Sequence, residues 1–208
     1  MGFLDKLEWR FATKEFDTNK VVPKDDLNKI LKAIRFAPTS YGLQPFHVYV
    51  ISDLALRKKI KTKSFLQKQI DSCSHLIIFC ARTDKKDMGK RVDDYADLST
   101  GDDKIKKLKI QPVKLMMKGS IQTKSDQELS CWSSKQCYIA LGFAMAAAAE
   151  LMIDSCPMEG FDKKAVDKLL NLPSHLKSTV LLPLGYRQKN PNRPKLRFPN
   201  DNLFTHLK

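Results

Sequence analysis

Apolar residues occur along this chain in two patterns: short uninterrupted runs, and runs that repeat every three or four residues. The run HLIIFCAR, residues 75–82, is apolar almost throughout and has polar residues at both ends, which is typical of a strand buried on both faces. FHVYVIS at 46–52 and STVLLPLGYR at 178–187 have a similar character. The pattern therefore predicts three strands.

Helical periodicity is clearest in two segments. In residues 23–37 the apolar positions follow i, i+3, i+4 and i+7 from Leu27, which gives one apolar face, and Pro38 ends the helix. Residues 126–152 predict a long helix with an Ala-rich middle that is apolar all round, so we expect it to be buried at close helix contacts. Shorter helices are predicted at 5–12, 53–60, 65–73 and 161–172.

Two further segments are less regular. Residues 84–124 are highly charged and predict one or two helices with a mobile connection. The tail from residue 188 is rich in proline and basic residues, but Phe198, Leu203 and Phe204 indicate that part of it docks on the protein. A few strands among many helices predict an α+β fold with a sheet covered on both faces.

The charge balance widens the range of partners to consider. The formal net charge is +14 and the pI is about 9.6. This balance fits nucleic acid, an anionic membrane surface or anionic small molecules, and it fits equally well a solvated surface with mixed charges. The densest basic clusters, 58–63 and 104–109, contain no aromatic residues, whereas a groove for single-stranded nucleic acid combines the two.

The cysteines and apolar segments limit the cellular compartments in which the protein is expected. Five cysteines occur without a CxxC pair or a zinc-ligand spacing, and reduced thiols in the cytoplasm are the plain interpretation. The first ten residues lack the pattern of a signal peptide, and the longest apolar run, 137–149, is too short to span a membrane. We therefore expect a cytoplasmic protein with no membrane partner.

Several common catalytic motifs are absent from the sequence. It contains no GxSxG of a hydrolase nucleophile, no GxGxxG of a dinucleotide-binding turn and no GxxxxGK[ST] of a P-loop. None of the four histidines lies at a metal-ligand spacing from another ligand residue. We therefore expect no metal site.

Three short segments contain candidate binding residues. Arg10 and Lys14 lie one helical turn apart without an acidic partner. Lys195 and Arg197 share one side of the tail if it is extended there, and together they can hold a phosphate. Gly160 lets the backbone approach a ligand closely. Each segment also has a simpler interpretation: an exposed helix end, a solvated basic tail, and a turn between a strand and a helix.

The connection between the second predicted helix and the first strand is unusually long. In APTSYGLQPFHVYVISD, residues 37–53, about nine small and polar residues precede the strand, whereas a simple turn needs two to five. This length indicates that something docks onto the loop.

Five segments occur in an order that resembles one known family. They are RFATKEFD, APTSYGLQPFHVYV, QKQIDSCSHLIIFCART, PMEGFD and RPKLRFP. In this order they resemble the FMN-dependent NAD(P)H nitroreductase family, over the whole chain apart from about 84–124. The resemblance implies an α+β fold with a central mixed β-sheet covered by helices on both faces, in an intertwined homodimer. It also implies a single domain over residues 1–208, with a helical lid region at about 84–125 and a C-terminal arm at 188–208.

The resemblance further implies an oxidoreductase with FMN as cofactor and NAD(P)H as co-substrate. In a ping-pong cycle, hydride passes from the nicotinamide to flavin N5, and the reduced flavin then reduces a nitroaromatic, a quinone or a similar acceptor. No residue is expected to act as an acid or a base, and Lys14 is expected to stabilise the negative charge of the reduced flavin. The expected partners are a second copy of the chain and a small-molecule acceptor, without nucleic acid or membrane.

The family's cofactor contacts map onto matching positions of this sequence. Arg10, Lys195 and Arg197 match a phosphate clamp. The loop at Pro38 matches one that lies against the flavin from the partner subunit, and the backbone of Glu159 and Gly160 matches the N–H groups that face N5 and O4. The expected cofactor contacts are Arg10, Phe11, Ala12, Lys14, Pro38, Thr39, Ser40, Gly42, Leu66, Gln67, Met158, Glu159, Gly160, Lys195 and Arg197.

The sequence departs from the family pattern at several of these positions. Ala12 stands where many relatives have Ser, and Gly42 stands where Asn is common. Leu66 occupies a position where an Asn often contacts the pyrimidine ring, and Gln67 and Gln69 are candidates to replace that contact.

Alternatives remain open at this stage. The departures at positions 12, 42 and 66 also fit a flavin-binding relative with weak reductase activity that acts in flavin handling or sensing. Net charge alone motivates a nucleic-acid-binding module. Met116 and Met117 lie in the region that usually covers the substrate, where they form either an adaptable lid or ordinary core packing.

Overall fold

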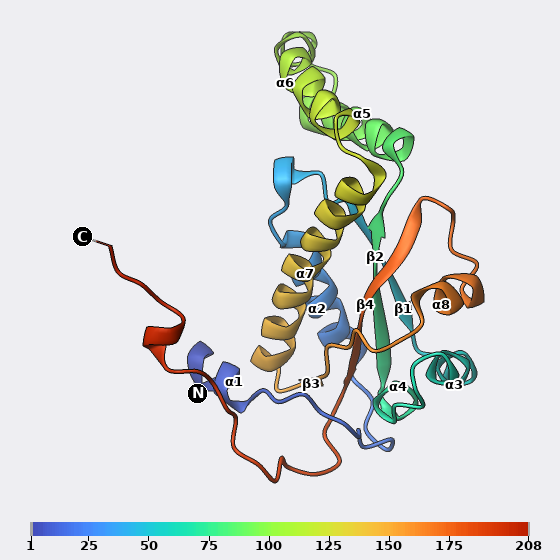
Figure 1. Cartoon of the computed structure of the whole chain (residues 1–208), viewed down its shortest axis with the longest axis vertical. Helices are drawn as coiled ribbons and strands as arrows, with labels where there is room; N and C mark the ends of the chain where they lie inside the picture. Colours follow the sequence, from blue (N-terminus) through green and yellow to red (C-terminus); the bar gives the residue numbers. More distant parts are fainter. Residues whose placement is uncertain (1, 208) are drawn as a thin grey trace.

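A four-stranded sheet forms the centre of the computed structural model, which describes residues 2–207 (Figure 1). The strand order is β1-β2-β4-β3, and all three ladders are antiparallel. The four described strands therefore form an antiparallel sheet and not the mixed sheet that was expected. Among the described residues the one parallel pairing is an isolated bridge between Ala12 and Ser155. The strands are β1 (Phe46–Ile51), β2 (His75–Arg82), β3 (Asp154–Ser155) and β4 (Leu176–Gly185).

The central strands contribute side chains to two hydrophobic cores. Successive residues of a strand point to opposite faces, so the unbroken apolar run of β2 is buried on both. Ile77 and Phe79 belong to one core, and Leu76 and Ile78 belong to the other. The strand predicted at residues 75–82 is confirmed with the same bounds.

Helices cover both faces of the sheet, as expected (Figure 1). The core that contains Phe79 is closed by α2 (Lys24–Phe36) and α7 (Asp126–Glu150). The other core is closed by α3 (Leu54–Thr62), α4 (Gln69–Ser72) and α8 (Lys163–Leu169). The first helix, α1 (Phe3–Trp9), packs near the C-terminal end of α7, where Lys6 pairs with Glu150.

The long helix α7 is buried on one side only. Ser125 and Glu128 form a capping box that fixes its start. Ala140 and Ala144 are fully buried against the sheet, but Tyr138 and Phe143 on another side are 38% and 42% exposed. The predicted burial of the apolar middle therefore holds on the side that faces the sheet, and the single chain leaves another apolar side of α7 uncovered.

The charged region predicted at residues 84–124 is a pair of helices, α5 (Lys85–Thr100) and α6 (Lys104–Gln122), which projects beyond the sheet (Figure 1). A small third core packs their lower parts against the start of α7. Met117 lies in this core and is 5% exposed, whereas Met116 is 54% exposed. Core packing therefore holds for Met117, and only Met116 remains available for a lid.

Two predictions about irregular segments need correction. The helix predicted at 65–73 is reduced to α4, because Phe65 and Leu66 have φ of 51° and 55°, in the left-handed region that interrupts a helix. Part of the tail docks, as expected, but through Lys195 and the backbone of Gln188, since Phe198, Leu203 and Phe204 are 73%, 56% and 61% exposed. The tail leaves the body of the chain and contains one short turn, η2 (Asn200–Asn202) (Figure 1).

Candidate active site

The segment that follows α1 runs beside β3 and carries three of the predicted contacts. The helix ends at Trp9, so the interpretation of Arg10 and Lys14 as neighbours on one helical turn is wrong. Ala12 forms its bridge with Ser155, and the neighbouring Thr13 is buried. Because alternate residues of an extended segment point the same way, this path places Arg10, Ala12 and Lys14 on a common side.

A basic cluster forms where this segment meets the C-terminal arm, residues 188–207. A cavity of about 300 Å³ is lined by Arg10–Ala12 and Arg193–Arg197. Lys195 Nζ donates hydrogen bonds of 2.7 Å to the carbonyl oxygens of Leu7 and Glu8, which lie in the last turn of α1. The carbonyls at a helix C-terminus lack partners within the helix, so they attract a cation. Lys195 thereby holds the base of the arm against α1.

The cations of this cluster repel one another. Burial lowers the pKa of Arg10, and the charge of Arg197 lowers it further. The pKa of Lys195 is also lowered, first by burial and then by Arg10 and Arg197. Across residues 2–207, no ion pair involves Arg10, Lys14, Lys195 or Arg197. The site therefore favours an anionic ligand on electrostatic grounds.

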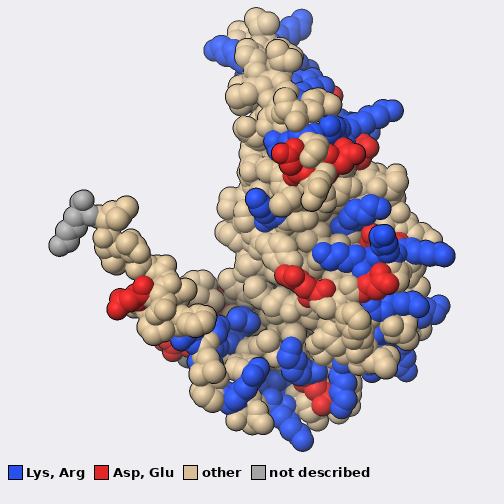
Figure 2. Space-filling model, in the orientation of Figure 1, with Lys and Arg blue, Asp and Glu red and all other residues tan. Residues whose placement is uncertain are grey.

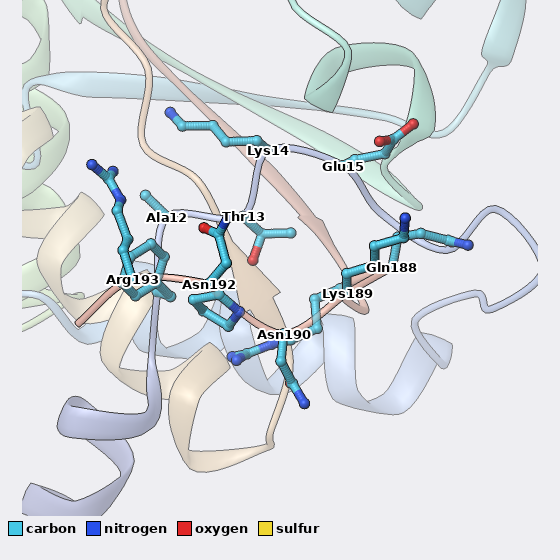
Figure 3. Close-up of a pocket in the computed structure, with 12 residues that line it drawn as sticks. Ala12, Thr13, Lys14, Glu15, Gln188, Lys189, Asn190, Asn192 and Arg193 are labelled. Atoms are coloured by element: carbon cyan, nitrogen blue, oxygen red, sulfur yellow. The ribbon is translucent and has the colours of Figure 1, made fainter. Parts of the chain in front are cut away.

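A second cavity of about 320 Å³ adjoins the first. Figure 3 shows residues 12–15 along one side of it and residues 188–193 of the arm along the other. Lys14 Nζ lies 3.8 Å from the Sγ of Cys156. Burial raises the pKa of the Cys156 thiol, an effect that the charges of Lys14 and Arg10 oppose. The partner of Lys14 is therefore a buried thiol, and its positive charge is not neutralised by a carboxylate.

The turn at Glu159 and Gly160 is held by two other elements. Tyr138 on α7 donates a hydrogen bond of 2.7 Å to Oε1 of Glu159, and Gln67 Nε2 donates one of 2.8 Å to the carbonyl of Gly160. A Cβ at Gly160 would lie 3.1 Å from Gln67 Nε2. The absence of a side chain therefore allows the close approach between this turn and the loop that precedes α4.

The residues suggested as replacements for a ring-contacting Asn have partners within the chain. Oε1 of Gln67 accepts from Gln69 Nε2 at 2.9 Å, while its amide nitrogen bonds Gly160. Gln69 is buried, whereas Leu66 is exposed beside them. These internal hydrogen bonds reduce the support for the expectation that Gln67 or Gln69 contacts a cofactor ring. Met158 is also buried, in the core that contains Leu181, so its side chain is a support for the turn.

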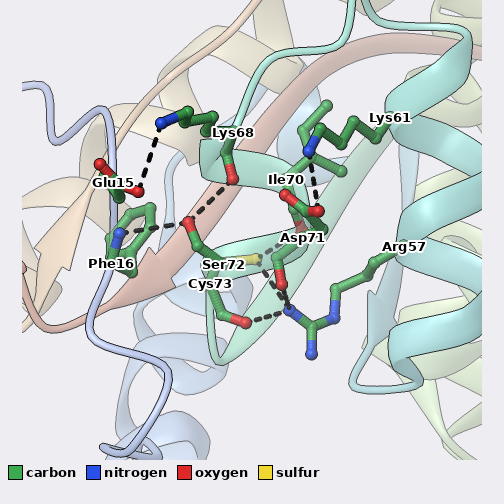
Figure 4. A network of polar contacts seen from close by, with 9 residues as sticks. All are labelled: Glu15, Phe16, Arg57, Lys61, Lys68, Ile70, Asp71, Ser72 and Cys73. Atoms are coloured by element: carbon green, nitrogen blue, oxygen red, sulfur yellow. Dashed lines mark hydrogen bonds and ion pairs between the residues drawn. The ribbon is translucent and has the colours of Figure 1, made fainter.

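A polar network fixes α4 against the N-terminal segment (Figure 4). The buried Arg57 donates to the carbonyls of Asp71 and Cys73, and it also donates to the carbonyl of Ser52 at 3.2 Å. Ser72 Oγ accepts from the backbone N–H of Phe16 at 3.1 Å. The position of α4, and with it the loop that carries Gln67, is therefore tied to the segment that follows Lys14.

The loop at residues 38–42 packs against the N-terminal half of α7. The N–H of Ser40 donates to Oε1 of Gln136 at 3.0 Å, and Thr39 Oγ1 accepts from the N–H of Gln44 at 2.9 Å. Gly42 has φ of +69°, and a Cβ there would lie 3.1 Å from the ring of Tyr95. The glycine at this position is therefore explained by local conformation and packing.

The two groups of predicted contacts do not meet within one chain. The loop is attached to α7 at Gln136, while α1 is attached at Glu150 through Lys6. Fourteen residues of helix separate these points, which corresponds to about 21 Å along the axis. The basic cluster therefore lies near the C-terminal end of α7, well along the axis from the attachment of Pro38, Thr39, Ser40 and Gly42, whereas the turn at Glu159 is attached at Tyr138.

Two neighbours of the site were not among the predicted contacts. Cys156 contacts Lys14, and the guanidinium of Arg193 lies 5.7 Å from the centroid of the Phe11 ring. Both residues fall inside or next to segments that carry the family resemblance, so only their side-chain contacts were missing from the sequence.

Comparison with known protein families decides the classification of the chain. The model described as the nitroreductase family matches residues 7–186. The chain belongs to the nitroreductase family. A family relative in Staphylococcus epidermidis, provisionally named an NAD(P)H nitroreductase, is 35% identical over 98% of this chain and 96% of its own length. One in Staphylococcus aureus, of the same name, is 39% identical over 93% and 90%.

Solved structures of other nitroreductase-family proteins have the same fold. A provisionally named nitroreductase of Bacillus subtilis superposes with a TM-score of 0.89 at 20% identity, over 99% of this chain and 98% of the other. One from Exiguobacterium sibiricum, solved in complex with FMN, gives 0.84 at 18% identity, over 100% and 98%. These likenesses establish the nitroreductase-like α+β fold.

Membrane-spanning helices and metal-ligand clusters are both absent from residues 2–207. No helix within residues 2–207 has the length and apolar character needed to cross a bilayer. The same residues contain no group of three or more His, Cys, Asp or Glu side chains arranged to hold a metal ion.

Proposed function

We propose that this nitroreductase-family protein is an FMN-dependent oxidoreductase. It takes reducing equivalents from NAD(P)H and passes them, in a separate half-reaction of a ping-pong cycle, to a nitroaromatic, a quinone or a similar small acceptor. The main support is the basic cluster of Arg10, Lys195 and Arg197, which has no acidic partner and adjoins the cavity at Lys14. The names of the staphylococcal relatives and the FMN complex of a structural neighbour support the same proposal.

The residues present fit FMN. A phosphate ester is a compact anion, and three cations that repel one another gain from binding it. Ala12 carries only a methyl group and lines both cavities, which leaves room for close approach of the cofactor, and Lys14 would add a positive charge beyond the phosphate end. Arg10, Lys195 and Arg197 would therefore hold the phosphate, and Lys14 would face the ring.

The side chains of this protein position and stabilise rather than react. When bound, FMN supplies the redox chemistry, which no side chain here provides. Lys14 contributes a positive charge that favours the more negative, reduced state of the cofactor. The hydrogen bonds of Tyr138 and Gln67 fix the backbone turn at Glu159 and Gly160, whose N–H groups we assign to the reactive edge of the ring. No acid or base is needed among these residues.

We further propose that the protein acts as an intertwined homodimer. The uncovered face of α7 lines an apolar groove of about 660 Å³ that includes Phe3, Ile139 and Phe143. An exposed apolar surface of this kind marks an interaction site. A second copy that covers it can bring its own Pro38, Thr39, Ser40 and Gly42 to the basic cluster, which supplies the contacts that one chain separates. The exposed apolar residues of the arm would then dock on the partner.

The remaining regions have proposed roles within one domain. The α5–α6 hairpin would serve as the lid region, with Met116 as its exposed apolar contact. Figure 2 shows acidic residues among the Lys and Arg of the visible face. This mixture supports a solvated basic surface over a nucleic-acid interface, so we propose only small-molecule acceptors as substrates. The cytoplasmic location remains a prediction, with which the free cysteines agree.

One observation favours the second candidate function, a flavin-binding relative with weak reductase activity that acts in flavin handling or sensing. Leu66 offers no hydrogen bond, and both ends of the Gln67 amide are occupied by residues of the chain. Fewer polar contacts to the ring would change its affinity and redox potential.

The first experiment is the visible absorption spectrum of the purified protein, followed by identification of the released chromophore. The proposal expects FMN, a dimer in sedimentation, and oxidation of NADH or NADPH when a nitroaromatic or quinone is added, with parallel double-reciprocal plots. Bound FMN with negligible turnover would favour the second candidate. A colourless protein that takes up no added FMN would contradict both.

A further inference from the structure

A buried carboxylate outside the predicted contacts joins the segments that line the site. Asp154, the first residue of β3, is 2% exposed. Its Oδ1 accepts from Nε of Arg187 at 2.8 Å and from Oγ1 of Thr13 at 3.2 Å. Its Oδ2 accepts from the backbone N–H of Arg187 at 2.8 Å. Nη2 of Arg187 lies 2.6 Å from Oδ1 and completes a close ion pair.

The arginine of this pair extends the connection to α1. The guanidinium of Arg187 lies 4.3 Å from the centroid of the Trp9 ring, and its Nη2 donates to the Trp9 carbonyl at 3.3 Å. Trp9 is the last residue of α1 and immediately precedes Arg10. A cation stacked on an aromatic ring and bonded to the same residue fixes both position and direction.

Each residue linked to Asp154 lies next to, or in the same segment as, a different cation of the site. Thr13 precedes Lys14, and Trp9 precedes Arg10. Arg187 lies two residues after the end of β4 and directly precedes the arm that carries Lys195, and the next residue, Gln188, donates its N–H to the carbonyl of Glu15 at 3.1 Å. The cavity of about 320 Å³ lies between these same two segments.

The carboxylate does this without neutralising the basic cluster. Its oxygens are occupied by Arg187 and Thr13, and no bond or ion pair joins it to Arg10, Lys14 or Lys195. Arg10, Lys195 and Arg197 repel one another, so a buried anchor outside the cluster helps to keep their segments together.

We propose that Asp154 is a positioning residue of the cofactor site, which acts through Arg187 and Thr13 to hold the segments of Arg10, Lys14 and Lys195 around one ligand. The inference rests on the proposed binding of FMN. It assigns to the buried pair a role in cofactor affinity in addition to its role in the fold.

The central test compares Asp154→Asn with a matched control, Asp93→Asn. Asp93 also holds two cations, Lys114 and Lys118, at 2.6 Å and 2.7 Å, but it lies in the α5–α6 hairpin away from the cofactor segments. FMN added to the apoprotein is titrated by quenching of its fluorescence. Since a misplacement of about 1 Å can cost roughly a hundredfold in function, we expect Asp154→Asn to raise the Kd at least about tenfold and Asp93→Asn to leave it unchanged.

A second measurement separates positioning from stability. Removing one partner of a buried ion pair destabilises a protein, whereas removing both charges is tolerated far better. The double variant Asp154→Asn with Arg187→Met is therefore expected to regain most of the thermal stability lost in Asp154→Asn and to keep the raised Kd. Thr13→Val, which leaves the ion pair intact, provides a milder variant with an expected rise of a few-fold.

Amide hydrogen exchange of the apoprotein gives a readout that is independent of FMN. Faster exchange in residues 188–197, with unchanged protection of β2, is the expected result for Asp154→Asn. Wild-type affinity in the stable double variant would overturn the inference and leave the proposed function intact. Failure of the wild-type protein and of Asp93→Asn to bind FMN would overturn both.

Discussion

Two cationic regions of this chain use the same residue types in opposite ways. In the α5–α6 hairpin, hydrogen bonds from Lys114 and Lys118 lower the pKa of Asp93, and the bond to Asp93 raises the pKa of Lys114. In the basic cluster the pKa values of Arg10 and Lys195 are both lowered, by burial and by neighbouring cations. Charge that is paired within the chain serves structure, whereas charge gathered without a partner is available for a ligand.

The largest expected difference between the two regions is in FMN affinity after their cations are removed. Replacing both Arg10 and Arg197 with Met should weaken FMN binding by about a hundredfold or more, because each charge-assisted hydrogen bond contributes about 1.5–3 kcal/mol. Replacing both Lys114 and Lys118 with Met should leave the affinity unchanged. Fluorescence titration of the two apoproteins measures the difference, and equal affinities would show that the unpaired cluster is not the phosphate site.

A smaller effect should follow from giving the unpaired cluster an internal partner. Leu196 lies between Lys195 and Arg197 and lines the same cavity, so Leu196→Glu brings a carboxylate to that cavity. The new acid competes with the ligand anion, and we expect FMN affinity to fall a few-fold, since an opposing charge at so exposed a position contributes about 0.2–1 kcal/mol. Leu115→Glu on α6 is the matched control. The loss should diminish at high salt, as isothermal titration can follow.

The smallest expected effect is on the stability that Asp93 contributes in the α5–α6 hairpin as the pH is lowered. The folded-state pKa of Asp93 is lowered from its ordinary value of 3.8, so its ionised form contributes stability that is present above that value. This contribution is lost as the pH falls through the lower folded value. Wild type should exceed Asp93→Asn in stability near pH 6 by about 0.5–1 kcal/mol, the range for exposed pairs, and the difference should fall to zero once the pH is below the lowered folded pKa. Thermal melts across this range test it, and a difference that grows toward low pH would contradict the sign.

The fold was predictable where local pattern and tertiary environment agree. The apolar run of β2 has no alternative to burial on both faces, and α7, whose Ala-rich middle is apolar all round, begins at its predicted residue. The strand expected to end before the turn at Gly160 is β3, but so short a strand has no periodicity from which to predict its bounds. The positive φ of Phe65 and Leu66 has no signature in a stretch without glycine. The arm was misjudged because its apolar residues find no surface on the same chain.

The candidate site divides in a similar way. Its cations were identifiable from residue type and from the order of the family segments. Their spatial grouping was not, since Arg10 and Lys195 meet only through the packing of the arm on α1. Asp154 carried no local signal at all, because a single acid between two apolar stretches shows nothing of the partners that its burial requires.

The separation of the attachment points on α7 has a consequence for how such proteins can change over time. If the dimer matches the loop of one copy to the basic cluster of the other, the span from Gln136 to Glu150 acts as a ruler. Inserting one heptad there would lengthen it by about 10 Å and misalign both sites at once. The hairpin of α5 and α6 spans no such pair of points, so gains and losses of sequence should accumulate in the hairpin and spare the ruler.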